Sequence, residues 1–472
     1  MFDEYMKQVE SSQQLANTFI RHFVNERTAI HVEKFMETPD ASIVQELRHA
    51  PISTKGRSLE EVVREMEEKV YRYNGRVDHP RQFGFIPGPA TSLSWLGDVM
   101  TNAYNPHAGG FALAPTVNAV EERLLEWLAE QIGYPSSSGG VFVSGGSMAN
   151  LTALVAARDA LLEEDTYHLG TAYVSDQTHS SVAKSLHVSG IRRQHIRIVP
   201  SDEQFRMDVE ALEAMIQEDK ERGLYPYVVI ASSGTTNTGS IDPLHEIASI
   251  CEKEQLWMHV DGAYGASIAL SPEYRHLLSG IERSDSISWD GHKWLFQTYG
   301  IAMVIVKDRQ HLLNSYHNAP EYLQDVASTE TQFNPWDLGI EMTRPARGLK
   351  LWLTLQTLGT EQVGKWITEG MKRAEFTEQL LRKDKEWTIV SPAQLAIINF
   401  RYTPAGYTEE QLDILNHQIS EEMLASGFAG VFTTKLKGKI VLRMVTIHPE
   451  TTDNDIEETI NRLTEIAKRL KK

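Results

Sequence analysis

A lysine lies beside a histidine and between two tryptophans in the stretch SWDGHKW, residues 288–294, which follows a predicted strand. Apolar neighbours would partly desolvate Lys293. Desolvation favours the neutral amine, which is the form that Schiff-base chemistry requires. A surface lysine at the end of a strand explains this heptapeptide equally well. The motif therefore indicates a Schiff-base lysine only if other chemical groups converge on it.

An aspartate ends the preceding apolar strand, in the stretch WMHVDGAYG, residues 257–265. In an open parallel sheet, ligands bind at the carboxyl ends of the strands, so Asp261 would lie at that edge. A carboxylate there can pair with a cationic ring nitrogen. The structural alternative is an aspartate that caps the N-terminus of a helix.

A glycine-serine turn, residues 144–150 (SGGSMAN), opens the helical stretch LTALVAARDALLEE. Free backbone N–H groups and the positive end of a helix dipole would make Gly145, Gly146 and Ser147 a seat for phosphate. The turn lacks the Gly-Lys-Ser/Thr of a nucleotide-binding P-loop and the spacing of a dinucleotide fingerprint. An ordinary helix cap is the alternative interpretation.

Two further polar clusters follow predicted strands: His179 lies in residues 175–181 (SDQTHSS), and Ser232 lies in residues 231–236 (ASSGTT). Each cluster alone is more often structural than functional. In sequence order, the five motifs provide backbone N–H groups for a phosphate, a histidine ring that can stack, serine and threonine hydroxyl groups, a carboxylate partner for a pyridinium, and a lysine. Each lies at the end of a predicted strand. This combination predicts a site for pyridoxal phosphate.

The elements that must position these residues alternate between short β-rich runs and helical segments from residue 79 to about residue 307. Such alternation predicts an α/β fold with a mostly parallel sheet that is covered on both faces. We expect a helical arm over residues 1–78, a large domain over 79–346 and a smaller α/β domain over 347–472. Residues 308–346 lack a sustained period, which predicts a long functional loop.

The composition excludes several classes of protein. A chain of 472 residues exceeds the roughly 250 to 300 residues that one core supports, so at least two domains are expected. The 46 Lys and Arg against 64 Asp and Glu give a net charge of −18, which disfavours nucleic acid and anionic membranes as partners. Cys251 is the only cysteine, so no intrachain disulfide can form. No run suggests a signal peptide or a membrane span, and we expect a cytoplasmic protein.

Several of these motifs also resemble a known family. The stretches HVDGAYG, DGHKW, SDQTHSSV, FVSGGSMANLTAL and HPRQFGFIPGPATS are similar to the group II pyridoxal-phosphate decarboxylases, and most similar to the bacterial aromatic-L-amino-acid decarboxylases. The resemblance extends from about residue 60 into the small domain. It implies the aminotransferase-like architecture called fold type I, pyridoxal 5'-phosphate as cofactor, and an obligate homodimer whose N-terminal arm embraces the partner subunit.

The resemblance also implies roles for individual residues. Lys293 would form the Schiff base, Asp261 would keep the pyridine nitrogen protonated, and His179 would stack on the ring. The phosphate would be bound by Gly145, Gly146, Ser147, Asp290 and His292, with Ser232 and Ala263 beside the ring. Mammalian aromatic decarboxylases have asparagine where this chain has Asp290, so an acid near the phosphate is a departure from the family.

The segment FGFIPGP, residues 83–89, matches the substrate-pocket segment of the family. It contains no cation near its aromatic residues, which favours an aromatic substrate over glutamate or aspartate. The expected substrate-binding residues are Phe83, Phe85, Pro87 and Trp336, with Ile86 beside them. Residues 107–113 of the partner subunit, including His107, are expected to line the same pocket.

A second departure concerns the residue that returns a proton to the substrate α-carbon. The animal and plant enzymes carry a loop tyrosine for this step, but residues 323–343 of this chain contain none. The proton donor would then be Tyr322 or His179. An amine-oxidising aldehyde synthase, a decarboxylase of 2,4-diaminobutyrate or glutamate, and a non-catalytic binding protein of the same fold remain alternatives, although Lys293 argues against the last.

Overall fold

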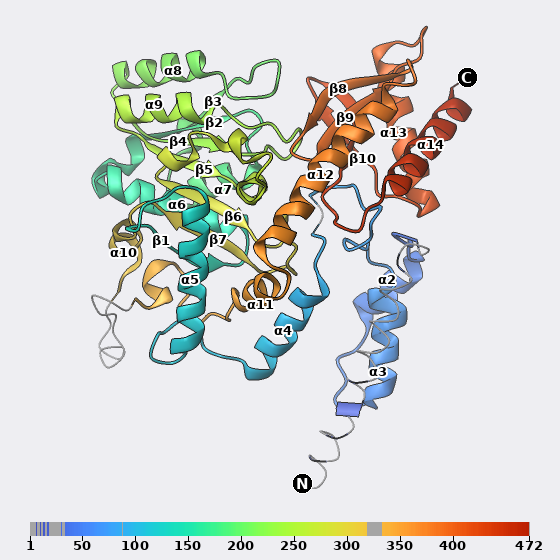
Figure 1. Cartoon of the computed structure of the whole chain (residues 1–472), viewed down its shortest axis with the longest axis horizontal. Helices are drawn as coiled ribbons and strands as arrows, with labels where there is room; N and C mark the ends of the chain where they lie inside the picture. The colour runs from blue at the N-terminus through green and yellow to red at the C-terminus, as the bar shows by residue number, and fades with distance from the viewer. Residues whose placement is uncertain are drawn as a thin grey trace.

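The structure is a computed structural model that describes residues 34–86, 88–318 and 333–471, together with Met6, Glu10, Gln13, Gln14, Asn17 and Ile30. Figure 1 shows the large sheet and its helices beside a smaller sheet that is covered by α12, α13 and α14. In the part of the chain that the structure describes, no helix is long and apolar enough to cross a membrane.

The large sheet has seven strands in the order β1-β7-β6-β5-β4-β2-β3. The strands are β1 (Gly139–Val143), β2 (Gly170–Ser175), β3 (Ile196–Val199), β4 (Tyr225–Ser232), β5 (Trp257–Asp261), β6 (Ser286–Asp290) and β7 (Ala302–Val306). Only β7 is antiparallel to its neighbours, β1 and β6. The mostly parallel sheet expected from the sequence is confirmed. Strand β1 was not predicted, because two of its five residues are glycines and it is short.

Helices cover both faces of this sheet (Figure 1). One face packs against α6 (Gly146–Leu161), α7 (Ser180–Val188) and α10 (Gln310–Tyr316), and the other packs against α5 (Pro115–Gln131), α8 (Val209–Glu221), α9 (Leu244–Glu254) and α11 (Leu349–Leu358). Side chains of β4 alternate between the two faces. Val228 and Ile230 pack in the core beside α6, α7 and α10, whereas Val229 and Ala231 pack in the core beside α5, α8, α9 and α11. Because both faces are buried, the strands are apolar on both sides.

The second sheet is antiparallel, with the order β10-β11-β9-β8. Its strands are β8 (Trp387–Gln394), β9 (Ile397–Tyr402), β10 (Phe432–Leu436) and β11 (Lys439–Val445), and its helices are α12 (Thr360–Leu381), α13 (Glu409–Ser426) and α14 (Asp453–Leu470). Strand β10 was not predicted, because only Leu436 of its five residues is buried. The domain limits proposed from the sequence remain a prediction.

The N-terminal elements are α2 (Ala41–His49), α3 (Leu59–Glu65), a π-helical turn (Met66–Tyr71) and α4 (Ser92–Tyr104). Ser58 caps α3 by accepting a hydrogen bond from the Glu61 amide at 3.2 Å, as the capping spacing predicts. Neither α2 nor α3 has a buried residue in this single chain. Short 3-10 turns complete the described elements, at Glu164–Leu169, Arg193–His195, Gly265–Leu270, Arg275–Leu278, Ile281–Arg283 and Pro335–Leu338.

The prediction of an aperiodic loop over residues 308–346 was wrong in part. The helix α10 and the turn Pro335–Leu338 lie within this range, and residues 319–332 lie outside the described residues. Helix α10 buries only Leu312 completely, so its seven residues show no apolar period in the sequence.

Asp242 holds the loop that follows β4. Its Oδ2 accepts from the Ser232 amide at 2.7 Å, and its Oδ1 accepts from the Met207 amide at 2.7 Å. Burial raises the pKa of this carboxyl group to about 6, in spite of the two backbone donors. The two hydrogen bonds from backbone amides to Asp242 hold the backbone in place where β4 ends.

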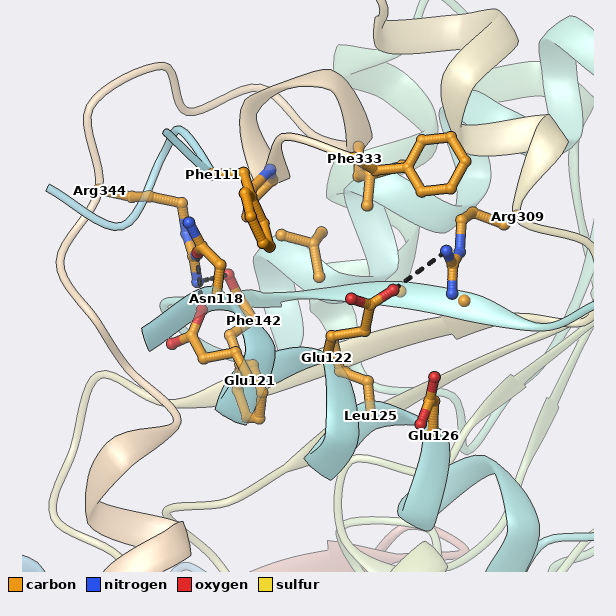
Figure 2. Close-up of a pocket in the computed structure, with 15 residues that line it drawn as sticks. Phe111, Asn118, Glu121, Glu122, Leu125, Glu126, Phe142, Arg309, Phe333 and Arg344 are labelled. Atoms are coloured by element: carbon orange, nitrogen blue, oxygen red, sulfur yellow. Dashed lines mark hydrogen bonds and ion pairs between the residues drawn. The ribbon is translucent and has the colours of Figure 1, made fainter. Parts of the chain in front are cut away.

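An ion pair between Arg344 and Glu121 joins several elements near the end of β1 (Figure 2). The Nη1–Oε2 distance is 2.7 Å, and both side chains are buried. Arg344 also donates to the carbonyl groups of Ala108 and Phe142, each at 3.0 Å, and the Gly348 amide donates to Glu121 at 2.7 Å. In Figure 2 the pair lies beside a cavity of about 40 Å³ that Phe111 and Phe333 also line.

Removing this carboxylate should destabilise the chain strongly. Glu121→Ala leaves the Arg344 cation buried without its ion-pair partner, and we expect a loss of about 3 to 5 kcal/mol in the free energy of unfolding. Glu130 lies on the same helix and pairs with the exposed Arg123 at 3.0 Å, so Glu130→Ala should cost less than about 1 kcal/mol. Urea denaturation of the two variants measures the difference, and equal losses would contradict this role of Glu121.

The raised pKa of Asp242 predicts a pH dependence of stability. Because the folded-state pKa of about 6 exceeds the ordinary value of 3.8, the contribution of Asp242 is fully present below about pH 4 and is lost as the pH rises through 6. Asp242→Asn removes this titration. The unfolding free energy of the wild type minus that of the variant should therefore fall by roughly 2 to 3 kcal/mol between pH 4 and pH 7. Denaturation curves across this range test it, and a difference that does not vary with pH would argue against it.

Candidate active site

A cavity of about 320 Å³ opens at the edge of the large sheet where the parallel strands end. It is lined by Gly145, Gly146, Ser147, Asn150, His179, Ser181, Ser232, Gly234, Thr235, Thr236, Asp261, Ala263, Tyr264, Asp290, His292 and Lys293. All ten residues that the sequence analysis assigned to a cofactor are among them. A volume of this size lies within the range of about 300 to 1,000 Å³ that is typical of small-molecule sites.

The strand register explains why these residues converge. Ser232, Asp261 and Asp290 are the last residues of β4, β5 and β6. Ser232 pairs with Asp261 across β4 and β5, and Asp261 pairs with Ser288 across β5 and β6. Residues separated widely in the sequence therefore share one edge.

The turn between β1 and α6 forms one wall of the cavity. Helix α6 starts at Gly146, and no side chain caps its N-terminus. A Cβ atom at Gly146 would lie 3.0 Å from Asp290 Oδ1 and 3.1 Å from the Ala263 Cβ, so any side chain here would crowd these two residues. Uncapped N–H groups at the positive end of a long helix suit a phosphate group.

The unusual acid at position 290 lies against two basic side chains. Asp290 Oδ2 is 3.0 Å from Lys293 Nζ and 3.4 Å from His292 Nε2. Its Oδ1 is buried and has no hydrogen-bond partner among the described residues. His292 donates from Nδ1 to the Ile301 carbonyl group at 3.0 Å, and burial lowers the pKa of this histidine. The acid thus balances the charge of the lysine within the cavity.

Asp261 is held by three hydrogen-bond donors. Its Oδ1 accepts from Ser288 Oγ and from the Ala263 amide, each at 3.2 Å, and its Oδ2 accepts from Asn150 Nδ2 at 3.2 Å. These three donors fix the orientation of the carboxylate. Local sequence pattern pointed to Asp261 but not to Asn150 or Ser288, although these two residues lie in the stretches SGGSMAN and SWDGHKW.

His179 immediately precedes α7 and lines the cavity. Its Nδ1 accepts from the Ser181 amide at 3.3 Å and lies 2.8 Å from Ser181 Oγ. These two contacts restrict the rotation of the imidazole ring.

Arg443 is a basic residue next to the site that the sequence analysis missed. It donates to the carbonyl groups of Thr236 and Asn237, and Thr236 lines the cavity. Burial lowers the pKa of Arg443 to about 10. An arginine inside the apolar run IVLRMVTI was the available signal, because an isolated charge in a strand needs a reason.

The structure does not bring Phe83 to the cavity. Its side chain is 1% exposed and belongs to the core of the small domain. The reason is backbone pairing: the Phe83 amide donates to the Gly430 carbonyl group at 3.1 Å, and the Phe83 carbonyl group accepts from Val445 at 2.9 Å. This pairing turns the side chain away from the predicted pocket.

The other predicted substrate residues also lie outside the set that lines the cavity. Phe85 is 64% exposed, with its ring centroid 4.7 Å from that of Phe432. Trp336 is buried against Gly110, and its ring lies 6.2 Å from that of His107 in an edge-to-face arrangement. Pro87 and Tyr322 lie outside the described residues.

The features on the cavity wall fit pyridoxal phosphate. The uncapped start of α6 suits its phosphate, Asp261 suits its ring nitrogen and Lys293 suits its aldehyde. The buried Asp290 Oδ1 without a partner and the narrow space at Gly146 both indicate that a ligand belongs in this cavity.

Comparisons with known proteins agree. Residues 42–403 match the family described as the pyridoxal-dependent decarboxylase conserved domain. An aromatic-L-amino-acid decarboxylase of Bacillus atrophaeus is 34% identical over 99% of this chain and 98% of that protein. An L-2,4-diaminobutyrate decarboxylase of Acinetobacter baumannii is 30% identical over 91% and 88%. The crystal structure of Oryza sativa TDC with PLP and tryptamine superposes with a TM-score of 0.93 at 27% identity, over 98% and 99%. The chain therefore belongs to the pyridoxal-dependent decarboxylases, the fold type I enzymes that use pyridoxal phosphate to remove a carboxyl group from an amino acid.

Proposed function

We propose that this enzyme converts aromatic L-amino acids to the corresponding amines and CO₂. The observation that carries the proposal is the convergence of ten cofactor-type residues in one cavity of a decarboxylase fold. When bound there, pyridoxal phosphate supplies an aldehyde that combines with amines and a conjugated pyridinium ring that accepts electrons.

Lys293 is the proposed residue that bonds to the cofactor aldehyde. Its Nζ lies 3.0 Å from Asp290 Oδ2, so the carboxylate restricts the position of the amine. Gly145, Gly146 and Ser147 bind the phosphate, with His292 nearby. Because the cavity is partly closed to solvent, hydrogen bonds to the cofactor are stronger here than in water.

Asp261 is the proposed partner of the ring nitrogen, and His179 is the proposed stacking residue. Three donors orient the Asp261 carboxylate, and a carboxylate at this position stabilises a positive charge on the ring nitrogen. His179, which lines the cavity, or Tyr322, which lies outside the described residues, is the proposed source of the proton that returns to the substrate α-carbon.

A second, mostly apolar cavity supports an aromatic side chain in the substrate. Its volume is about 220 Å³, and its lining includes Gly88, Trp95 and Tyr299. The Tyr299 ring lies 5.3 Å from that of His292, which lines the cofactor cavity. Apolar walls beside the reaction centre favour a planar ring over a charged side chain.

Decarboxylation of 2,4-diaminobutyrate is the second candidate. The Acinetobacter relative carries that name, and Asp78 is a carboxylate in the lining of the second cavity. Asp78 is 3.8 Å from Arg76, a cation that already offsets part of its charge. The aromatic substrate class is therefore the better supported of the two.

We also propose that the enzyme is a homodimer. Leu96, Val99, Met100 and Tyr104 form an exposed apolar stripe along α4. Exposed Leu113, Ile340 and Met342 extend the apolar surface, and α2 and α3 bury no residue in the single chain. A second copy would cover these surfaces. In this arrangement His107 and Trp336 are proposed to line part of the substrate site of the partner subunit.

Replacement of Lys293 tests the covalent assignment. Lys293→Ala should abolish turnover and leave pyridoxal phosphate bound only noncovalently, because the nucleophilic amine is gone. Borohydride treatment followed by peptide mass mapping should find cofactor on residue 293 of the wild type and nowhere in the variant. Lys184→Ala, at an exposed lysine of α7, is the control and should keep both turnover and the fixed cofactor. Borohydride-fixed cofactor in Lys293→Ala would disprove the assignment.

Competition between paired substrates tests the aromatic class. Apolar contact discriminates between rings that differ by one hydroxyl group by only about 10- to 200-fold in kcat/KM. Phenylalanine, tyrosine, dihydroxyphenylalanine and tryptophan should therefore all be decarboxylated. Amine and aldehyde products are quantified together from each mixture. A preference above about 10⁴ for one ring would reveal a dedicated hydrogen-bond partner. Faster turnover of 2,4-diaminobutyrate or glutamate than of every aromatic substrate would overturn the assignment.

A further inference from the structure

A continuous series of hydrogen bonds runs through the buried interior from Trp257 to Asp261. Trp257 Nε1 lies 2.8 Å from Ser286 Oγ, and Ser286 Oγ lies 2.8 Å from His259 Nδ1. His259 Nε2 lies 3.0 Å from Asn150 Oδ1, and Asn150 Nδ2 lies 3.2 Å from Asp261 Oδ2. All five residues are buried, so water does not compete for these bonds.

The two ends of the series, together with a neutral histidine ring, fix the direction of every bond. An indole N–H only donates and an ionised carboxylate only accepts. Asn150 Nδ2 must therefore donate to Asp261, which leaves Asn150 Oδ1 to accept from His259 Nε2–H. His259 Nδ1 then carries a lone pair and accepts from the Ser286 hydroxyl group, while Ser286 Oγ accepts from Trp257. The orientation of the amide and the tautomer of the imidazole follow without ambiguity.

The histidine in this series is neutral. Burial lowers the pKa of His259 to about 4, well below its ordinary value. A neutral Nε2–H tautomer uses both ring nitrogens, one as a donor and the other as an acceptor. The bond dipoles all point in one direction, toward the carboxylate of Asp261, and such aligned bonds strengthen one another.

Asn150 also reaches the other side of the cavity. Its Nδ2 lies 3.4 Å from Ser181 Oγ, and Ser181 Oγ lies 2.8 Å from His179 Nδ1. One buried amide thus joins the carboxylate expected at the ring nitrogen to the imidazole expected over the ring face.

We propose that Asn150, His259 and Ser286 are positioning residues that orient the Asp261 carboxylate toward the cofactor ring nitrogen. They act through Asp261 and do not touch the cofactor themselves. This inference rests on the proposed function, in which Asp261 is the partner of the ring nitrogen.

The tautomer of His259 is the most direct test. Nitrogen-15 NMR of histidine-labelled enzyme, with and without pyridoxal phosphate, distinguishes a protonated ring nitrogen from one with a lone pair. The His259 signals are identified by their absence in His259→Phe. A neutral ring with the proton on Nε2 is expected at neutral pH. A proton on Nδ1, or a doubly protonated ring, would overturn the proposed direction of the hydrogen bonds.

Matched variants test the effect on the cofactor. Asn150→Leu should weaken pyridoxal phosphate binding by about 10- to 100-fold, because one buried carboxylate oxygen loses its donor. Ser286→Ala should weaken it by about 2- to 10-fold, since the lost bond is two residues further from Asp261 along the series. Ser267→Ala is the control: Ser267 is also buried and accepts from a tryptophan, Trp289 Nε1 at 2.9 Å, but no hydrogen bond joins it to Asp261 among the described residues.

Cofactor affinity is measured by titrating the apoenzyme of each variant with pyridoxal phosphate. The absorbance spectrum of the bound cofactor, kcat and the substrate KM are then measured for the same variants. Asn150→Leu and Ser286→Ala should lower kcat with little change in the substrate KM and should alter the cofactor spectrum, whereas Ser267→Ala should change neither. Effects of Ser286→Ala no larger than those of Ser267→Ala would overturn the positioning role.

Asp261→Ala separates this inference from the function on which it rests. A loss of several orders of magnitude in kcat for Asp261→Ala, combined with wild-type affinity and kcat in Asn150→Leu, would refute the positioning residues alone. A mild effect of Asp261→Ala would instead refute the role of Asp261 itself, and the positioning role would be refuted with it.

Discussion

Parallel pairing of β4, β5 and β6 is the constraint on which the site depends. The register places Ser232 opposite Asp261 and Asp261 opposite Ser288, so three strand ends deliver their polar groups to one edge. A shift of one residue in β5 would turn Asp261 to the opposite face of the sheet. Cores on both faces prevent such a shift, because it would also exchange every apolar side chain of the strand between them.

Three buried carboxylates lie close to that edge, and each is compensated in a different way. Asp261 accepts three hydrogen bonds, Asp242 accepts from two backbone amides, and Asp290 lies beside Lys293. An uncompensated buried charge would destabilise the fold severely. Of the three, only Asp290 leaves an oxygen without a partner among the described residues. This oxygen belongs to a residue that lines the cofactor cavity.

The sequence predicted most of what depends on local pattern. The apolar runs before Ser232, Asp261 and Asp290 predicted strands, and polar residues just after strands must share an edge in a parallel sheet. Elements with a weak apolar pattern were missed, such as β1 with its two glycines and α10 with its single fully buried residue. Phe83 does not line the cofactor cavity, because backbone pairing with a segment hundreds of residues away decides where its side chain points. For the same reason, the contacts of Asn150 and Arg443 could not be read from their local sequence.

The antiparallel β7 has a consequence for Lys293. Because β7 returns directly beside β6, with Ala302 opposite Asp290, residues 291–301 form a hairpin connection and not a crossover to a helix. Both ends of this connection are anchored at the same edge, and the Gly291 amide donates to the Ile301 carbonyl group at 3.1 Å. A short loop closed at its base has little conformational entropy left to lose. The lysine is thus held on the rigid frame of the large sheet, and since the residues that line the cavity all lie between Gly145 and Lys293, a rotation of the small domain would not displace the nucleophile.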